Sequence, residues 1–185
     1  MTETATAVRV DAPLFEYVLR LGDSCLILGH RLSEWCGHGP QLEEDIALAN
    51  VALDLIGQAR MLLSYGGEVE GAGRSEDDLA YLRDGTAYRN WLLVERPNGD
   101  YAYTTARQFL FDAFMHEFWR GLAESCDQHL ADVAAKAMKE NAYHLRHSSQ
   151  WMIRFGDGTE ESHDRVQNAL NDLWAYTGEL FESDE

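Results

Sequence analysis

Two stretches decide the fold, VALDLIGQARML at residues 51–62 and AMKENAYHLRHS at residues 137–148. Both have the composition and apolar spacing of helices. The first holds Leu55 and Gln58 three residues apart, and the second holds Asn141 and His144 at the same spacing. Residues three apart share one face of a helix, so each pair projects in one direction. Of these four side chains, only that of His144 is a common metal ligand.

The spacing matters because di-iron carboxylate bundles use it for their ligands. In those bundles two helices each carry Glu-x-x-His, and two further helices each supply one carboxylate. Here leucine, glutamine and asparagine stand at three of the four positions. The sequence therefore predicts the scaffold of an oxygen-activating enzyme that has lost its metal chemistry.

The rest of the chain is consistent with helices throughout. We expect a loose tail at residues 1–12 and helices at 13–35, 40–65, 101–124, 128–155 and 159–181, in a single domain covering 1–185. The second and third helices are separated by a crossover insertion at 66–100. One long crossover is typical of the ferritin-like bundle. The expected fold class is all-α, a ferritin-like four-helix bundle with one long crossover and an additional C-terminal helix, although a plain bundle with an irregular insertion would fit the same pattern.

Charge and cysteine content restrict the function. The formal net charge is −17, which argues against nucleic acid and anionic membranes as partners. Three cysteines, Cys25, Cys36 and Cys126, form no CxxC motif, which favours a reducing, cytoplasmic setting. We find no signal pattern and no run of about 18 apolar residues that could span a bilayer.

A polar row runs along the second helix. Asn50, Asp54 and Gln58 recur at four-residue steps among apolar neighbours. A buried structural hydrogen-bond network and a former metal site would both explain this row. Asp54 does not simply replace the glutamate missing at position 55, because positions 54 and 55 lie on opposite sides of Gln58 around the helix.

Other helices offer few further ligands. Asp112, within LFDAFMHEFW, is expected to face inward and to be paired, whereas the direction of Asp23 is open. His144 and His147 form an HxxH pair that is either a metal half-site or structural. Glu140 is expected to pair with Lys136, His144 or a neighbouring helix. We expect no catalytic residue, cofactor or metal in this chain, and the degenerate ligand positions are Leu55, Gln58, Asp112, Asn141 and His144.

Three segments carry a family resemblance: LRLGDSCLILGHRLSEWCGHGPQLEEDIALANVALDLIGQARMLLSY, LLVERPNGDYAYTTARQFLFDAF and KAMKENAYHLRHS. They are similar to the PaaC family of phenylacetate-degradation proteins, subunits of the multicomponent monooxygenase phenylacetyl-CoA 1,2-epoxidase. The match covers about Leu14 to Glu185. Members usually continue well past the position of Glu185, so a C-terminal truncation is one interpretation of this sequence.

The resemblance implies a division of labour between subunits. A PaaA-like sister with the same ferritin-like fold carries the di-iron site on helices that read DExGH and KEExxH. This chain has Asp54-Leu55-Ile56-Gly57-Gln58 and Lys139-Glu140-Asn141-Ala142-Tyr143-His144 there, so both ligand glutamates are replaced. The implied role is a non-catalytic scaffold or regulatory subunit of a complex that uses phenylacetyl-CoA, O₂ and NADPH.

Two alternatives stay open at this point. One is an active metal-dependent oxygenase with an unusual site around Asp112 and His144. The other is a helical interaction protein unrelated to oxygenases. The tryptophans bear on the choice, because they anchor either protein interfaces or the core of this chain. They are Trp35, Trp91, Trp119, Trp151 and Trp174.

Overall fold

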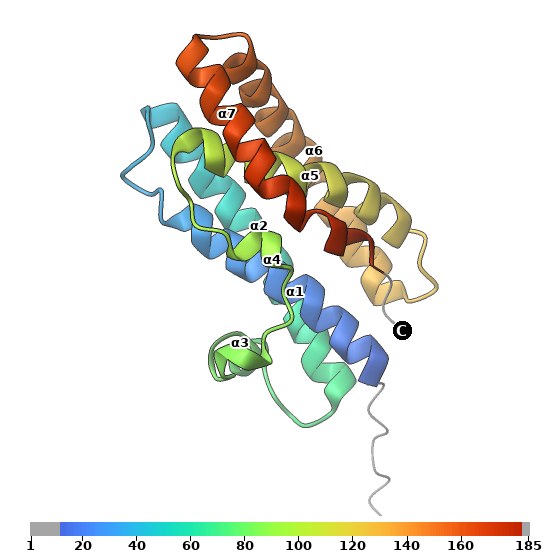
Figure 1. The fold of residues 1–185 in the computed structure, drawn as a ribbon. Helices are drawn as coiled ribbons and strands as arrows, with labels where there is room; N and C mark the ends of the chain where they lie inside the picture. The colour runs from blue at the N-terminus through green and yellow to red at the C-terminus, as the bar shows by residue number, and fades with distance from the viewer. Residues whose placement is uncertain (1–11, 183–185) are drawn as a thin grey trace, which may run out of the picture.

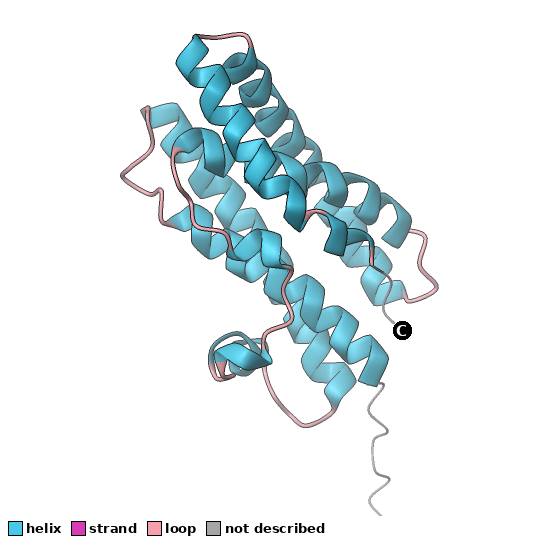
Figure 2. Ribbon diagram, in the orientation of Figure 1, coloured by secondary structure: helices cyan, strands magenta, loops and turns pink. Residues whose placement is uncertain are grey.

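The computed structural model describes residues 12–182, and it has the expected ferritin-like architecture (Figure 1). Four long helices form two hairpins. In the first, α1 (Ala12–Ser33) packs along α2 (Leu42–Glu70), and in the second, α5 (Tyr101–Leu122) packs along α6 (Gln128–Gly156). No strand occurs among residues 12–182 (Figure 2). The predicted tail lies outside the described residues except for Ala12, which already belongs to α1.

Helix α2 continues beyond its predicted end. The sequence suggested that the crossover begins at Gly66, but α2 continues through Gly66 and Gly67 to Glu70. A Cβ atom at Gly67 would lie 2.3 Å from the carbonyl oxygen of Arg74, so glycine there allows the returning chain to approach. The helix ends at Gly71, whose φ of 67° is in the left-handed region. These glycines therefore mark a close contact and a cap, not the start of a loop.

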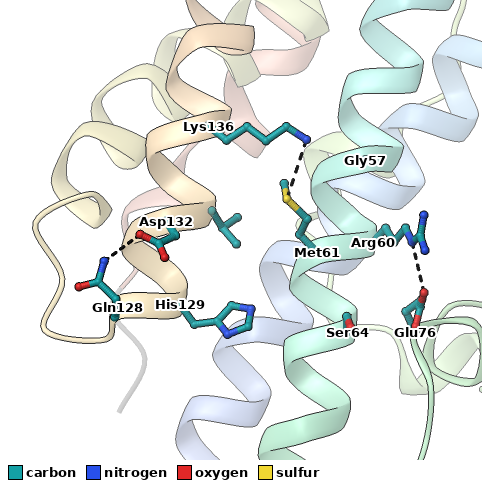
Figure 3. Close-up of a pocket in the computed structure, with 10 residues that line it drawn as sticks. Gly57, Arg60, Met61, Ser64, Glu76, Gln128, His129, Asp132 and Lys136 are labelled. Carbon is teal, nitrogen blue, oxygen red and sulfur yellow. Dashed lines mark hydrogen bonds and ion pairs between the residues drawn. The ribbon is translucent and has the colours of Figure 1, made fainter.

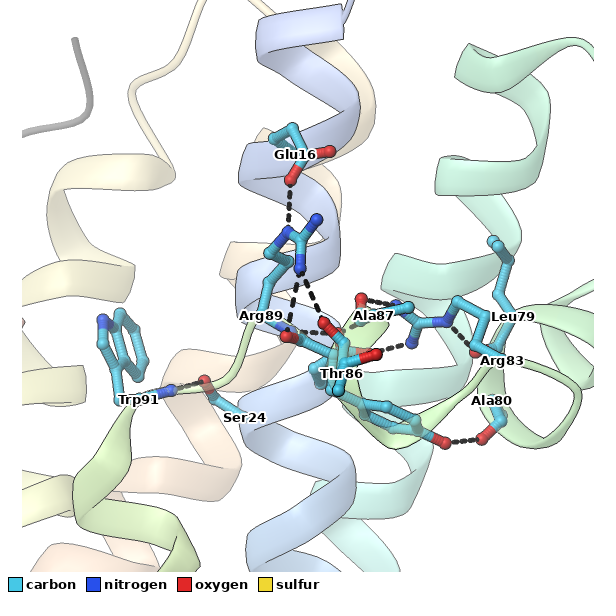
Figure 4. Close-up of polar contacts among 11 residues, drawn as sticks. Glu16, Ser24, Leu79, Ala80, Arg83, Thr86, Ala87, Arg89 and Trp91 are labelled. Carbon is cyan, nitrogen blue, oxygen red and sulfur yellow. Dashed lines mark hydrogen bonds and ion pairs between the residues drawn. The ribbon is translucent and has the colours of Figure 1, made fainter.

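The crossover is ordered and lies against α1. It contains α3 (Glu76–Tyr81), the 3₁₀ turn η1 (Gly85–Ala87) and α4 (Leu92–Glu95). Asp23, whose direction the sequence left open, is fully buried and faces this crossover. It accepts hydrogen bonds from the guanidinium of Arg83 at 3.0 Å and from the backbone N–H of Arg89 at 2.9 Å. Nearby, the N–H of Trp91 donates to the hydroxyl of Ser24 (Figure 4). Asp23 thus fastens the crossover and does not enter the centre of the bundle.

The C-terminal region is more broken than predicted. Instead of one helix at 159–181, α7 (Glu160–Leu173) is followed by the short 3₁₀ turns η2 (Trp174–Tyr176) and η3 (Gly178–Phe181). Helix α7 packs against α5 and α6 (Figure 1). The core is formed by apolar side chains from all the α-helices and from η3.

One helix, α2, is long and apolar enough by length and composition to cross a membrane, although polar residues interrupt its apolar sequence. An 18-residue window of α2 has a mean hydropathy of 1.4, and 44% of that window is buried inside the fold. Because core helices of globular proteins pass the same test, this composition by itself does not indicate a membrane.

Candidate functional site

Gln58 joins three helices at one of the degenerate ligand positions. Its amide nitrogen donates to Glu140 Oε2 at 2.9 Å, and its carbonyl oxygen accepts from the Cys25 thiol at 3.7 Å. Burial raises the pKa of Cys25 to about 12, so the thiol keeps the proton that it donates. One turn earlier, Leu55 is 2% exposed and packs in the apolar core. Both ligand positions on α2, 55 and 58, are therefore occupied by contacts within the chain.

His144 on α6 binds a carboxylate from α2. Its Nε2 lies 3.0 Å from Asp54 Oδ2, and the imidazole is almost completely buried whereas Asp54 is 39% exposed. Burial lowers the pKa of His144, although the hydrogen bond to Asp54 acts in the opposite direction. Burial increases along the polar row of α2: Asn50 is exposed, Asp54 is half-buried and Gln58 is buried. The sequence did not predict the contact between Asp54 and His144.

The remaining ligand position on α6 is polar but uncharged. Asn141 is 2% exposed, and its Oδ1 has no hydrogen-bond partner among the described residues. The adjacent Glu140 accepts from Gln58 and lies 3.7 Å from the ammonium of Lys136. Two of the three partners considered for Glu140 are thus present, Lys136 and a neighbouring helix, while His144 pairs elsewhere.

Asp112 faces inward and is paired, as predicted. Its two oxygens accept from Gln108 Nε2 at 2.7 Å and from the Ser148 hydroxyl at 2.8 Å. Burial raises its pKa to about 8, although both hydrogen bonds act to lower it. The carboxyl is therefore protonated at neutral pH. Its bonds connect α5 to α6 and do not involve His144.

His147 belongs to a second polar cluster, at the N-terminal end of α2. Glu44 Oε2 accepts from His147, Tyr101 and Trp151, each at 2.8 Å. Burial raises the pKa of Glu44, but these three hydrogen bonds outweigh it and the net pKa is lowered. The two histidines of the HxxH pair therefore bind different carboxylates, Asp54 and Glu44.

These residues do not fit a di-iron centre. Two iron ions need several anionic oxygen ligands around them. Within residues 12–182, no three His, Cys, Asp or Glu side chains gather in an arrangement that could hold a metal ion. Gln58, Asp112 and His144 instead form hydrogen bonds with neighbouring side chains of this chain.

Sequence reasoning missed two participants, Cys25 and Glu44. Cys25 lies in line with Leu21 and Leu28 on α1, where a thiol looks like any small apolar group. Glu44 could have been found, because Glu44, Val51 and Gln58 recur at seven-residue steps and so lie on one line of α2.

Together the fold and the site define a class of protein: a helical bundle related to the di-iron carboxylate proteins, in which other side chains stand at the positions of the iron ligands. The chain belongs to the family described as "Phenylacetic acid catabolic protein", whose model matches residues 1–185. It is also similar to the C subunit of 1,2-phenylacetyl-CoA epoxidase from Escherichia coli (strain K12). The two are 54% identical over 172 residues, which cover 93% of this chain and 69% of that protein.

Proposed function

We propose that this chain is a non-catalytic scaffold subunit of a phenylacetyl-CoA 1,2-epoxidase and that it pairs with a PaaA-like sister subunit holding the di-iron centre. The observation that carries the proposal is Gln58, which bonds Cys25 and Glu140 where a ligand histidine would be needed. Family membership and the similarity to a phenylacetyl-CoA epoxidase component support it.

In this proposal the chain contributes rigidity and a surface. The contacts of Gln58 with Glu140 and of Asp54 with His144 hold the two helical hairpins together, and the contact of Asp112 with Ser148 fastens α5 to α6 within the second hairpin. Phenylacetyl-CoA binds to the complex, and the sister carries out the oxygen chemistry. A cytoplasmic setting without membrane or nucleic acid is part of the same proposal.

The rival functions have less support. A metal site around Asp112 and His144 would have to break the bonds of Asp112 to Gln108 and Ser148 and that of His144 to Asp54. A helical protein unrelated to oxygenases is disfavoured by the family match.

Reconstitution tests the proposal. The sister, the other components and the reductase are assayed for phenylacetyl-CoA epoxidation with and without this chain, and iron is measured in each purified subunit. We expect turnover to need this chain and stoichiometric iron to copurify with the sister alone. Full turnover without this chain would refute the scaffold role. About two metal ions per copy of this chain, with activity from this chain and reductase alone, would favour the metalloenzyme.

A further inference from the structure

Helix α2 carries a second apolar stripe that points away from the core. It consists of Leu42, Ile46, Ala49 and Leu53, which we call the outer seam. Leu42, Ile46 and Leu53 are 72%, 53% and 66% exposed. Their spacing of four, three and four residues is that of the a and d positions of a heptad, the pattern by which one helix packs along another.

The opposite face of α2 is already occupied. Leu48, Ala52, Leu55 and Leu62 are buried in the core, where α2 packs against α1. A helix with apolar side chains on two faces is normally covered on both. The fold buries only one of them, which explains why a strongly apolar window of α2 is 44% buried.

The surface continues from the outer seam onto α6. A cleft of about 740 Å³ lies between the two helices and is lined by Gly57 and Arg60 from α2 and by His129 and Lys136 from α6 (Figure 3). Tyr143 is 42% exposed and stands seven residues after Lys136, on the same side of α6. The α2–α6 face thus combines an apolar ridge with an adjoining hollow.

Basic and acidic side chains are balanced in the cleft. The chain has a net charge of −17 but only two lysines, Lys136 and Lys139, both on α6, and Lys136 lines the cleft. The charge of Arg60 is offset by Glu76, whose carboxylate lies 3.2 Å from the guanidinium, and that of Lys136 by Glu140, whose carboxylate lies 3.7 Å from the ammonium. Among the residues that line the cleft, Arg60 and Lys136 balance Glu76 and Asp132, which lets another protein approach the cleft with little repulsion.

The net charge also bears on the identity of the partner. Two copies of this chain would bring together two molecules of charge −17, which repel at moderate salt. A different chain that is less acidic avoids that repulsion. An apolar seam in 4–3–4 spacing fits best against a helix with the same pattern, so the partner should itself present a long helix.

We propose that the outer seam and the adjoining cleft are the docking surface for a long helix of the catalytic sister subunit. This inference rests on the proposed function and adds to it the face through which the two subunits meet. Leu53 is the central anchor, because it is the exposed leucine nearest the cleft along α2.

Co-expression with the full-length sister tests the face. The variants are Leu53→Glu and Ile46→Glu, and the matched control is Leu82→Glu, which changes a side chain 77% exposed in the crossover. Each is measured by affinity retention and size-exclusion chromatography. We expect at least a tenfold loss of retained sister for the two seam variants and less than a twofold change for the control.

Two further measurements separate folding from docking. Urea unfolding of the free variants should match wild type, because the changed side chains are exposed. Amide hydrogen exchange at residues 42–57 should slow in the complex. Retention of the sister by both seam variants would overturn the inference even if the scaffold role holds. A wild-type homodimer broken by Leu53→Glu would assign the seam to a second copy and overturn it as well. Failure of wild type to bind the sister would overturn the proposed function and the inference together.

Discussion

Asp112 carries the clearest pH dependence at the scale of single residues. Its folded pKa of about 8 lies above the unfolded value near 4, so the folded carboxyl holds a proton that the unfolded chain has released at neutral pH. The stability that this proton contributes is fully present below about pH 4 and is lost as the pH rises through about 8. Wild type should therefore lose stability from pH 5 to 8.

Replacing the carboxyl by an amide removes that titration. The free energy of unfolding of Asp112→Asn, relative to wild type, should rise by about 1 kcal/mol per pH unit between pH 5 and 8, measured by urea denaturation. Asp164→Asn changes an exposed carboxyl on α7 and serves as the control, which should follow wild type. If the free energies of unfolding of Asp112→Asn and wild type changed in parallel with pH, the raised pKa of Asp112 would be contradicted.

Restoring the missing ligands should destabilise the metal-free chain. The triple variant Leu55→Glu, Gln58→His and Asn141→Glu places two carboxylates at positions that are 2% exposed. Burying an unpaired charge costs several kcal/mol, so the variant should melt well below wild type in chelator. Leu53→Glu makes the same change at an exposed site nearby and should melt close to wild type. A triple variant as stable as wild type would show that the pocket tolerates charge.

Residue spacing predicted the defects at Leu55 and Asn141 but not the contact between Asp54 and His144. The reason is rotational. Spacing fixes which side chains share a face of one helix, whereas the rotation of α2 relative to α6 decides which flank of that face meets the neighbour. Met61 lines the cleft toward α6 and is seven residues after Asp54, so that flank faces α6. This rotation is a property of packing, which a single sequence does not encode locally.

At the scale of elements, the crossover depends on one buried ion pair. Arg83 and Asp23 are 5% and 0% exposed, and the same carboxylate binds the backbone of Arg89. Asp23→Ala should cost about 3–5 kcal/mol because it leaves a buried guanidinium without its carboxylate. Glu16→Ala breaks an ion pair with Arg89 that is half exposed and should cost no more than about 1 kcal/mol. Urea denaturation measures both losses of stability. Limited proteolysis at residues 84–91 reports whether the crossover has detached from α1. Equal losses for the two variants would show that burial does not decide how strongly the ion pair of Asp23 and Arg83 holds the crossover.

The order of the crossover could not be read from its sequence. Its glycines and charged residues are typical of a surface loop, and the elements that form are short. Ser75 and Asp78 make a capping box that starts α3, a local signal that was present. The attachment to Asp23, by contrast, joins residues about 60 positions apart, which no local pattern predicts.

The five tryptophans show the same limit. Trp91 and Trp119 are buried in the core, Trp35 and Trp151 are partly buried, and Trp174 is 67% exposed. Their abundance fits either an interface or the core of this chain, because composition does not say which side chains face outward. The exposed leucines of α2 are the stronger sign, because they follow one line of a helix.

At the scale of the molecule, the acidic excess sets how the free chain responds to salt. At about 0.01 M salt the Debye length is about 30 Å, so like charges repel across much of the surface, whereas at 1 M it is about 3 Å. Exposed ion pairs such as Arg165 with Glu161 are screened as well, but each contributes only about 0–1 kcal/mol. With 32 acidic and 15 basic residues, repulsion outweighs attraction.

The melting temperature of the free chain should therefore rise with NaCl between 0.01 and 0.5 M. A gain of about 1 kcal/mol corresponds to about 2–4 °C for a chain of this size. The control is the triple variant Glu68→Gln, Glu124→Gln and Asp164→Asn, which removes three exposed carboxylates that have no ion-pair partner among residues 12–182. It should melt higher than wild type at low salt and respond less to NaCl, because it starts with less repulsion. A melting temperature that falls as salt is added would mean that attractive pairs dominate, and would remove the electrostatic argument against a homodimer.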